Sequence, residues 1–452
     1  MLAAQTERPP LTAAEHRAAF FRQSGWLMLA SVGGGALMWA VHLLSRPAGP
    51  EQYGLFVAFL SVIMCIPATP LQTAMAHQTA RALAMNRPRA LSGITRLVWL
   101  WTFLVWLAGA AVVAVFQKQI LEHWNTRNVA GLWVTVFTAL FAFWMPLFQG
   151  VLQGQQNFLW LGWSMMFNAF GRLAVAVLAA LALAFVAAGR AAGVSLLDAR
   201  TWPRSVSGHL ATGMMAGVLL GMVGAAALAV WQTRSVWQGH AERFDRIALL
   251  REMVPLLLGS GAVLFLFSGD TMFVKAYFDD TQVGYYGSAG TLSRALLWLV
   301  GPLATVMFPR LVHSTAKAEK SNLLGLVLAG SAALSVAGAL GLCVLGPTVI
   351  RIVNGPDYAR GAAPWVPWYA AAVVPVAVAN VLVNAMLARS SFRVVPVLVL
   401  LAAAYGFALT RFHATPVMVL QTMFAFNFVL LVVSALFTWL GHRRGADLAP
   451  AE

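Results

Sequence analysis

Long, uninterrupted apolar runs are the feature that most constrains this chain. About twelve of them follow one another, each close to the roughly 20 residues that an α-helix needs to cross a bilayer. Apolar and polar residues do not alternate within the runs, as they would in a membrane β-barrel. The sequence therefore predicts an all-α polytopic membrane protein. The expected spans are 24–44, 55–77, 94–116, 129–152, 161–189, 208–231, 253–276, 291–309, 322–345, 365–388, 394–410 and 416–440.

The composition excludes a soluble enzyme, a disordered chain and a disulfide scaffold. Hydrophobic residues make up 60% of the chain and charged residues only 10%, against about 25% in a typical soluble domain. The net charge is +15, but the basic residues lie in short loops between the apolar runs. In such loops they set the membrane orientation and contact anionic lipid headgroups. We therefore expect membrane lipids as partners, and no nucleic acid.

The distribution of Lys and Arg predicts the orientation of the chain. If the N-terminus is cytoplasmic, cytoplasmic segments carry 17 of these residues and the outer loops carry 10. The excess follows the positive-inside rule. We therefore expect both termini in the cytoplasm.

The spans also divide into two halves of six. We expect a cytoplasmic segment 1–23, a first bundle 24–231, a cytoplasmic connector 232–252, a second bundle 253–440 and a cytoplasmic tail 441–452. Early in each half an acidic turn precedes a Tyr-Gly pair, Tyr53-Gly54 and Tyr286-Gly287. Because six is even, the halves would be parallel repeats. Within the connector, residues 240–252 predict a short amphipathic helix on the inner surface.

Charged residues within the runs mark candidate functional positions, because a charge in a span usually faces a partner or a cavity. Asp270 and Arg294 lie at similar depths on consecutive spans. They are either a structural ion pair, or Asp270 couples transport to a proton or cation. Lys275 lies at the outer end of its run, and we expect its ammonium group to reach the interface.

Arg172 lies near the middle of the fifth run. Ser164, Asn168 and Arg172 recur every four residues, which forms a polar stripe on an otherwise apolar helix. The stripe is typical of a cavity lining, or of a helix–helix contact in which Arg172 donates to backbone carbonyls. Gln149 and Gln153 begin a weaker stripe that would either bond sugar hydroxyls or cap the fourth span. Pro67 and Pro70 would loosen the second span.

Several motifs of other functions are absent from the sequence. It has no phosphate-binding loop with a Gly-rich Lys-Ser/Thr pattern, no nucleophile elbow, and no His/Cys cluster with metal spacing. Its predicted loops are also short. A membrane polymerase or ligase would need a sizeable outer loop for its catalytic residues. We therefore expect neither an enzyme nor a metal or cofactor.

Four stretches carry a resemblance to a known family. They are 269–289 followed by Phe308-Pro309-Arg310, the turn 46–56, the turn 152–158, and Gly355-Pro356-Asp357-Tyr358 before a Pro-rich span. Together they resemble O-antigen-type polysaccharide flippases of the multidrug/oligosaccharidyl-lipid/polysaccharide (MOP) exporter superfamily. The resemblance implies about twelve helices in two six-helix bundles around a central cavity. It also implies alternating access, a lipid-linked oligosaccharide as cargo, and a place in the bacterial cytoplasmic membrane.

The charge of Arg172 bears on the nature of the cargo. A cation near mid-membrane favours an anionic cargo, such as an oligosaccharide on polyprenyl pyrophosphate. A multidrug cation exporter of the same superfamily is the alternative, and it would place acidic residues in its cavity. A further alternative is a non-catalytic membrane subunit of a polysaccharide export complex. Under the flippase hypothesis, a polysaccharide polymerase or export proteins are possible partners.

Overall fold

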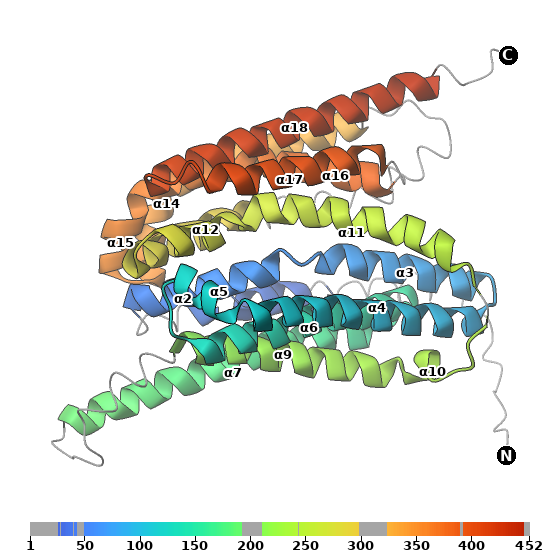
Figure 1. Ribbon diagram of the computed structural model, residues 1–452, viewed down its shortest axis with the longest axis horizontal. Helices are drawn as coiled ribbons and strands as arrows, with labels where there is room; N and C mark the ends of the chain where they lie inside the picture. Colours follow the sequence, from blue (N-terminus) through green and yellow to red (C-terminus); the bar gives the residue numbers. More distant parts are fainter. Residues whose placement is uncertain are drawn as a thin grey trace.

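The computed structural model describes residues 26–27, 29–38, 40–42, 49–191, 210–242, 244–297, 323–388 and 392–446. All regular structure in these residues is helical, and the helices run along the long axis of the molecule (Figure 1). In this part of the chain, 10 helices are long and apolar enough to cross a membrane. The prediction of an all-α polytopic membrane protein is therefore confirmed.

The first half of the chain contains a shorter apolar helix, Leu29–His42, where we expected the first span. The other helices of this half are α2 (Gly49–Met64), α3 (Ala68–Ala84), α4 (Pro88–Val115), α5 (Gln117–His123), α6 (Val129–Gly154), α7 (Phe158–Ala191), α9 (Leu210–Gln232) and α10 (Arg234–Trp237).

The second half begins with α11 (Arg246–Ser268), α12 (Asp270–Tyr277) and a helix over 280–297. The remainder of the expected span 291–309 lies outside the described residues. The half continues with α14 (Leu323–Val353), α15 (Pro356–Ala362), α16 (Val366–Ala388), α17 (Val395–Leu409) and α18 (Pro416–Ala446). The predicted segment 1–23 and the last residues of the predicted tail also lie outside the described residues.

Local sequence signals explain several helix ends. Asn128 caps α6 by accepting a hydrogen bond from the backbone N–H of Gly131, and Asp245 caps α11 by accepting from Ile247 and Ala248. The second span breaks at residues 65–67, where the α3 N-cap is Pro67, so the predicted loosening occurs there. The seventh span breaks at Gly269, between α11 and α12.

The connector differs from our expectation. Instead of an amphipathic helix over 240–252, the short helix α10 is followed by irregular backbone, and α11 already begins at Arg246. The irregular part is bound to α4: Arg96 donates to the carbonyl oxygens of Trp237 and Gly239, and Ser92 also donates to Gly239. These bonds satisfy backbone groups that a helix would have satisfied internally.

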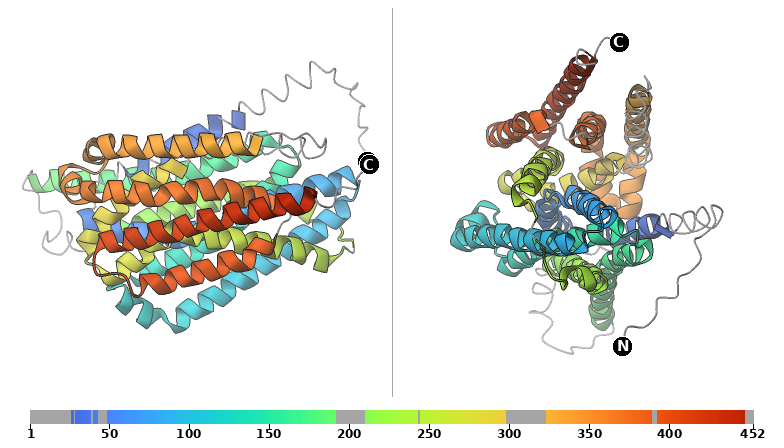
Figure 2. Two further views of the ribbon diagram at one scale, coloured as in Figure 1. Left: turned by 90° about the horizontal axis from the view of Figure 1, so that it is seen from above. Right: turned by 90° about the vertical axis from the view of Figure 1, so that its right-hand side faces the viewer.

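The helices gather in two groups that follow the two halves of the sequence. In the end-on view of Figure 2, helices coloured yellow to red lie together on one side and those coloured cyan to green on the other. In the first half, α9 packs on α7 and α6, and α3 packs on α6; in the second, α16 packs on α18 and α14. The blue helix α2 lies between the groups and contacts α12 and α11.

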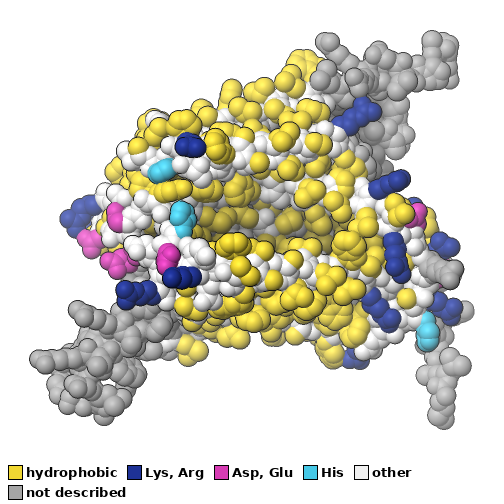
Figure 3. Space-filling view, viewed as in Figure 1, with side chains coloured by type: hydrophobic (Ala, Val, Ile, Leu, Met, Phe, Trp, Pro, Cys, Tyr) yellow, Lys and Arg dark blue, Asp and Glu magenta, His cyan; other side chains and the backbone are white. Residues whose placement is uncertain are grey.

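Charged side chains gather at the two ends of the molecule and leave a broad hydrophobic band between them (Figure 3). We call the right-hand end, which holds loop 85–87 and the connector, the connector end, and the opposite end the far end. Exposed basic residues at the connector end include Arg81, Arg87, Arg89, Arg234, Arg246 and Arg251. Figure 3 also shows a hollow along the boundary between the halves, lined mainly by hydrophobic side chains.

The two halves touch through their backbones at the far end. A Cβ atom on Gly54 of α2 would lie 2.6 Å from the backbone nitrogen of Gly284 in helix 280–297. A Cβ on Gly284 would overlap the carbonyl oxygen of Pro50. The structure thus brings Gly284, rather than the Tyr286-Gly287 pair that we compared with Tyr53-Gly54, against Gly54. Glycine lets these helices approach at backbone distance because it has no side chain.

Candidate functional site

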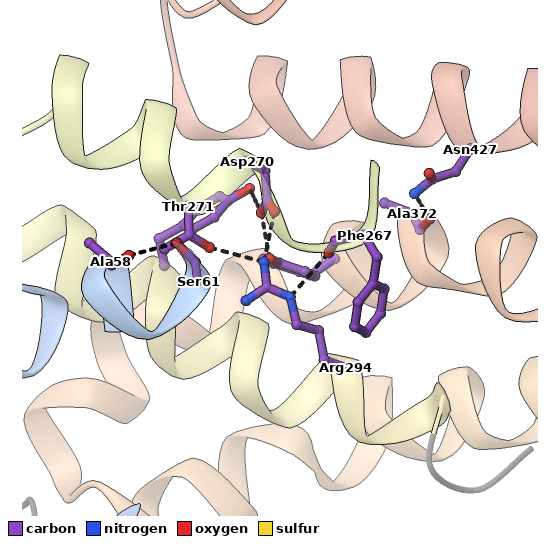
Figure 4. Close-up of polar contacts among 10 residues, drawn as sticks. Ala58, Ser61, Phe267, Asp270, Thr271, Arg294, Ala372 and Asn427 are labelled. Atoms are coloured by element: carbon purple, nitrogen blue, oxygen red, sulfur yellow. Dashed lines mark hydrogen bonds and ion pairs between the residues drawn. The ribbon is translucent and has the colours of Figure 1, made fainter. Parts of the chain in front are cut away.

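A buried ion pair lies in the second half, beside the boundary with the first. Asp270 is the first residue of α12, and Arg294 comes from helix 280–297. Nη2 of Arg294 donates to Oδ1 of Asp270 at 2.7 Å and to Oγ1 of Thr271 at 2.9 Å (Figure 4). Nε of Arg294 donates to the carbonyl oxygen of Phe267 at 3.3 Å. This carbonyl group has no partner within the helix because α11 ends at Ser268. The break at Gly269 therefore supplies part of the arginine site.

Two tyrosines complete the surroundings of Asp270. Tyr286 and Tyr369 both donate to Oδ2 of the carboxylate, at 2.7 Å and 2.5 Å. Both tyrosines and Asp270 are 0% exposed. The guanidinium of Arg294 also lies 5.4 Å from the ring centre of Tyr369. The carboxylate is therefore neutralised by one cation and bonded by two hydroxyls, as a buried charge requires.

The ion pair lies against α2, which belongs to the first half. Figure 4 shows Ser61 of α2 beside Thr271 and Arg294, and Ser61 donates to the carbonyl oxygen of Ala58 at 2.7 Å. Since α2 packs directly on α12, the Asp270–Arg294 pair is part of the boundary between the two halves.

A small pocket with polar and apolar lining residues lies at the same boundary, and we call it the boundary pocket. His42 and Tyr53 line it from the first half; Ser288, Thr291 and Asn354 line it from the second, with Leu292, Val349, Ile350 and Val353. Oη of Tyr53 is 3.0 Å from Nδ1 of His42, and the Tyr53 hydroxyl lies 3.4 Å from Oγ1 of Thr291. Ser288 donates to Oδ1 of Asn354 at 3.0 Å. The pocket thus brings polar groups from both halves together.

Arg172 lies on α7 in the first half, close enough to His42 for the two side chains to interact electrostatically. Its Nε is buried without a hydrogen-bond partner. Among the described residues no carboxylate forms an ion pair with it. Arg172 therefore differs from Arg294, whose guanidinium is enclosed by acceptors.

The other members of the predicted stripes have different surroundings. Ser164 is 0% exposed, donates to the carbonyl oxygen of Ala225 on α9, and accepts a hydrogen bond from Gln149 on α6 at 2.9 Å. These hydrogen bonds join α6, α7 and α9, so they agree with the alternative of a contact between helices for Ser164. Asn168 is also buried, with Oδ1 unpartnered. Gln153 accepts from Gln72 of α3 at 3.0 Å.

Lys275 also differs from expectation. It does not extend to the interface; its side chain is 1% exposed and pairs with Asp280 at the start of the next helix. The turn after α12 brings the carboxylate of Asp280 to the ammonium group of Lys275. Sequence depth alone did not reveal this partner.

Several residues of the site were not predicted. Sequence analysis did not single out Tyr369, Asn354 or His42, and it used Tyr286 only as a mark of the repeat. A buried tyrosine in an apolar helix has no periodic signal that distinguishes it from core packing. Among the described residues no group of three or more His, Cys, Asp or Glu side chains is arranged to hold a metal ion.

Comparison with known proteins defines the class of fold. No family model and no curated protein matches the chain. Solved structures do: the fold is that of the MATE multidrug transporters and of the lipid II flippase MurJ.

Three of these structures illustrate the likeness. An inward-facing MATE transporter of the MOP superfamily superposes with a TM-score of 0.68 at 11% identity, over 91% of this chain and 96% of its own. MurJ in an inward closed conformation gives 0.64 at 11% identity, over 91% and 86%. A eukaryotic MATE transporter gives 0.58 at 12% identity, over 93% and 96%.

Proposed function

We propose that this protein is a membrane transporter that moves a lipid-linked oligosaccharide across the cytoplasmic membrane by alternating access. The cargo is anionic, carried on a polyprenyl pyrophosphate, and serves the synthesis of a cell-surface polysaccharide. The fold supports the transporter class, since structures of this fold include multidrug transporters and a lipid II flippase. The proposal includes no catalytic step.

The observation that carries the choice of cargo is the contrast between Arg172 and Asp270. Arg172 has no ion-pair partner among the described residues and lies near the boundary pocket. Asp270 is already bonded to Arg294, Tyr286 and Tyr369. A phosphate would supply the acceptors that Arg172 lacks, whereas a cationic drug would have to displace Arg294 from Asp270.

Purified protein tests the cargo class directly. We expect farnesyl pyrophosphate, a soluble polyprenyl pyrophosphate, to raise the thermal unfolding midpoint of the wild type, because ligand binding stabilises the folded state. Arg172→Ala should abolish the shift, and Arg172→Lys should keep part of it, since it retains the charge without the planar fork. Arg234→Ala, an exposed arginine of the connector end, is the matched control and should respond like the wild type.

The alternatives give other results. Stabilisation by tetraphenylphosphonium and none by farnesyl pyrophosphate would favour the multidrug cation exporter. In cells, Arg172→Ala should reduce surface polysaccharide while membrane abundance stays near normal. Loss of the protein from the membrane would instead favour a packing role of Arg172 between helices. Normal polysaccharide with Arg172→Ala would exclude contact with the cargo.

A further inference from the structure

One side of α3 is exposed and yet carries no large hydrophobic side chain. The exposed residues between positions 68 and 80 are Thr69, Thr73, His77 and Ala80. Their spacing of four, four and three residues places them on one side of the helix. The other side packs on α6, and its residues Met75 and Thr79 are buried. We call the exposed strip of these four residues the α3 face.

The neighbouring helix α4 shows the contrasting composition of a lipid-facing surface. Its side chains Leu100, Leu104 and Val105 are 50–56% exposed. The hydroxyl of Thr73 does not by itself exclude lipid, since it donates to the carbonyl oxygen of Thr69 within its own helix. The imidazole of His77 cannot be satisfied in that way, and its side chain is 63% exposed. The α3 face is therefore suited to water and poorly suited to lipid.

The break in the second span lies at the inner end of the α3 face. Residues 65–68 are only half-buried, and Pro67 has no N–H with which to continue the helix. Irregular backbone at membrane depth is tolerated where protein buries it or where it lines a water-filled cavity. The break is at the boundary between the halves, because Cys65 is close enough to Arg294 and Asp270 to interact with them electrostatically. A half-buried break at this place indicates access of water.

A carboxylate of the second half bridges the outer part of the α3 face. Glu252 of α11 accepts a hydrogen bond from Nε2 of Gln78 at 3.0 Å, and its other oxygen lies 3.6 Å from Nδ1 of His77. Both partners belong to α3, which contacts α11 toward the connector end (Figure 1). We call this contact the Glu252 bridge. Thr69 and Thr73 lie on the membrane side of it, and Ala80 lies on the side of the connector end.

We propose that the α3 face is one wall of a water-filled entry path, by which the polar head of the cargo reaches the boundary between the halves from the connector end. The Glu252 bridge closes this path. When the bridge opens, water has access along the face as far as the break at residues 65–67. The path runs about 12 Å from His77 to Thr69, at 1.5 Å per helical residue.

The chemistry of the α3 face suits the hydroxyl groups of an oligosaccharide as well as water. Threonine hydroxyls can donate and accept, and an imidazole can do both. The small side chain of Ala80 leaves space at the entrance. The nature of the cargo rests on the proposed function, but the existence of a water-filled path does not. The path is therefore tested first without any cargo.

The rate of thiol modification measures the access of water. Thr73→Cys is made in a background with Cys65→Ser and Cys343→Ser, and the protein is placed in lipid nanodiscs. The reagent is a trimethylammonium methanethiosulfonate, whose permanent charge keeps it in water. Leu100→Cys on α4 is the matched control, because Leu100 is exposed at a similar distance from loop 85–87.

We expect Thr73→Cys to react at least about tenfold faster than Leu100→Cys, since only a thiolate reacts and apolar surroundings suppress its formation. Thr69→Cys should behave like Thr73→Cys and decides the matter if that variant does not fold. Equal rates at the α3 face and at Leu100 would overturn the proposal, because the face would then be in lipid.

Removal of the bridge tests its part in the proposal. Glu252→Ala should raise the rate at Thr73→Cys about threefold to tenfold, as the loss of one hydrogen bond predicts. The rate at Ala80→Cys should not change, because Ala80 lies outside the bridge. Glu242→Ala, an exposed carboxylate of the connector, is the control and should leave both rates unchanged. An unchanged rate at Thr73→Cys in Glu252→Ala would overturn the closing role of the bridge.

A bulky side chain tests whether the cargo uses the path. Thr73→Trp should reduce surface polysaccharide with normal membrane abundance, and Leu100→Trp should not. If Arg172→Ala reduces polysaccharide and Thr73→Trp does not, the path does not carry the cargo. If neither substitution has an effect while Thr73→Cys is readily modified, the proposed function fails and the water-filled path stands.

Discussion

Single buried polar groups in this protein have partners that come from distant parts of the chain. Asp270 is bonded to Arg294, which is 24 residues away, and to Tyr369, which is 99 residues away. The cluster joins α12, helix 280–297 and α16. In a low-dielectric interior, each of these bonds is stronger than it would be in water, and each unpaired group is costly. Stability at this point therefore depends on the cluster being complete.

The ion pair gives a testable prediction. Asp270→Asn leaves Arg294 without a counter-charge in buried surroundings, and breaking such a pair costs about 3–5 kcal/mol. We expect a lower unfolding midpoint in detergent and less folded protein in membranes. Adding Arg294→Gln should restore part of the loss.

The double variant decides the role of the pair. A double variant no more stable than the worse single one would mean that the residues are not partners in stability. If Asp270→Asn instead folds normally and only transport stops, Asp270 acts in coupling. Arg360→Gln, which breaks an exposed pair with Asp357, is the control and should change stability by less than about 1 kcal/mol.

The partner of a buried polar residue can be predicted from the sequence only where the positions of the two residues along the chain indicate that they meet. Depth on consecutive spans suggested the pairing of Asp270 with Arg294, because the two spans are neighbours. The same reasoning failed for Lys275, whose partner Asp280 begins the next helix. For Ser164 and Gln149 the sequence left two alternatives open, since a polar stripe looks alike whether it faces a cavity or another helix.

At the scale of elements, close helix crossings depend on glycine. The crossing of α7 and α9 is one example: a Cβ on Gly221 would overlap the carbonyl oxygen of Asn168, and a Cβ on Gly171 would overlap Gly221. Small residues allow membrane helices to approach closely enough for van der Waals packing and backbone contact, which is how such helices associate.

A substitution on α9 tests this crossing. Gly221→Ala should destabilise the protein by about 1–3 kcal/mol, the usual cost of overpacking, because backbone cannot move aside as a side chain can. Gly213→Ala on the same helix is the matched control, since a Cβ there meets nothing within 4 Å. We expect it to be within about 0.5 kcal/mol of the wild type. Thermal unfolding in detergent would compare the two, and equal effects would contradict the packing argument.

Helices could largely be located from hydrophobicity, but only some of their interruptions could. The break at residues 65–67 was predicted because it contains a proline. The break at Gly269 was not, because its cause is tertiary: the freed carbonyl oxygen of Phe267 accepts from Arg294. The predicted helix over 240–252 was also wrong in its first part, because the chain before Arg246 is irregular and its backbone is bound to α4.

At the scale of the whole molecule, the segments that connect the long helices lie alternately at one end of the molecule and at the other. Loop 85–87, the connector and the end of α18 lie at one end, and α5, α12 and α15 lie at the other (Figure 1). The count of Lys and Arg in the sequence predicts that the connector end is cytoplasmic, and exposed arginines gather there.

Reporter fusions check this orientation. Fusions after Arg243 and after Arg443 should both report a cytoplasmic location, because an even number of spans separates them. A fusion after Thr126, between α5 and α6 at the far end, is the control and should report the opposite side. Opposite locations for the first two fusions would contradict the six-plus-six arrangement.

The contact between Gly54 and Gly284 has a consequence for how this sequence can vary. A methyl group at either position would enter the contact between α2 and helix 280–297: at Gly54 it meets the backbone of Gly284, and at Gly284 it meets the backbone of Pro50. Once one methyl group has forced the helices apart, a second meets less resistance, so the two positions do not tolerate change independently. The alternating access proposed above requires a state with the far end open, and in that state the dependence would vanish. The interdependence of the two substitutions would then distinguish the two conformations.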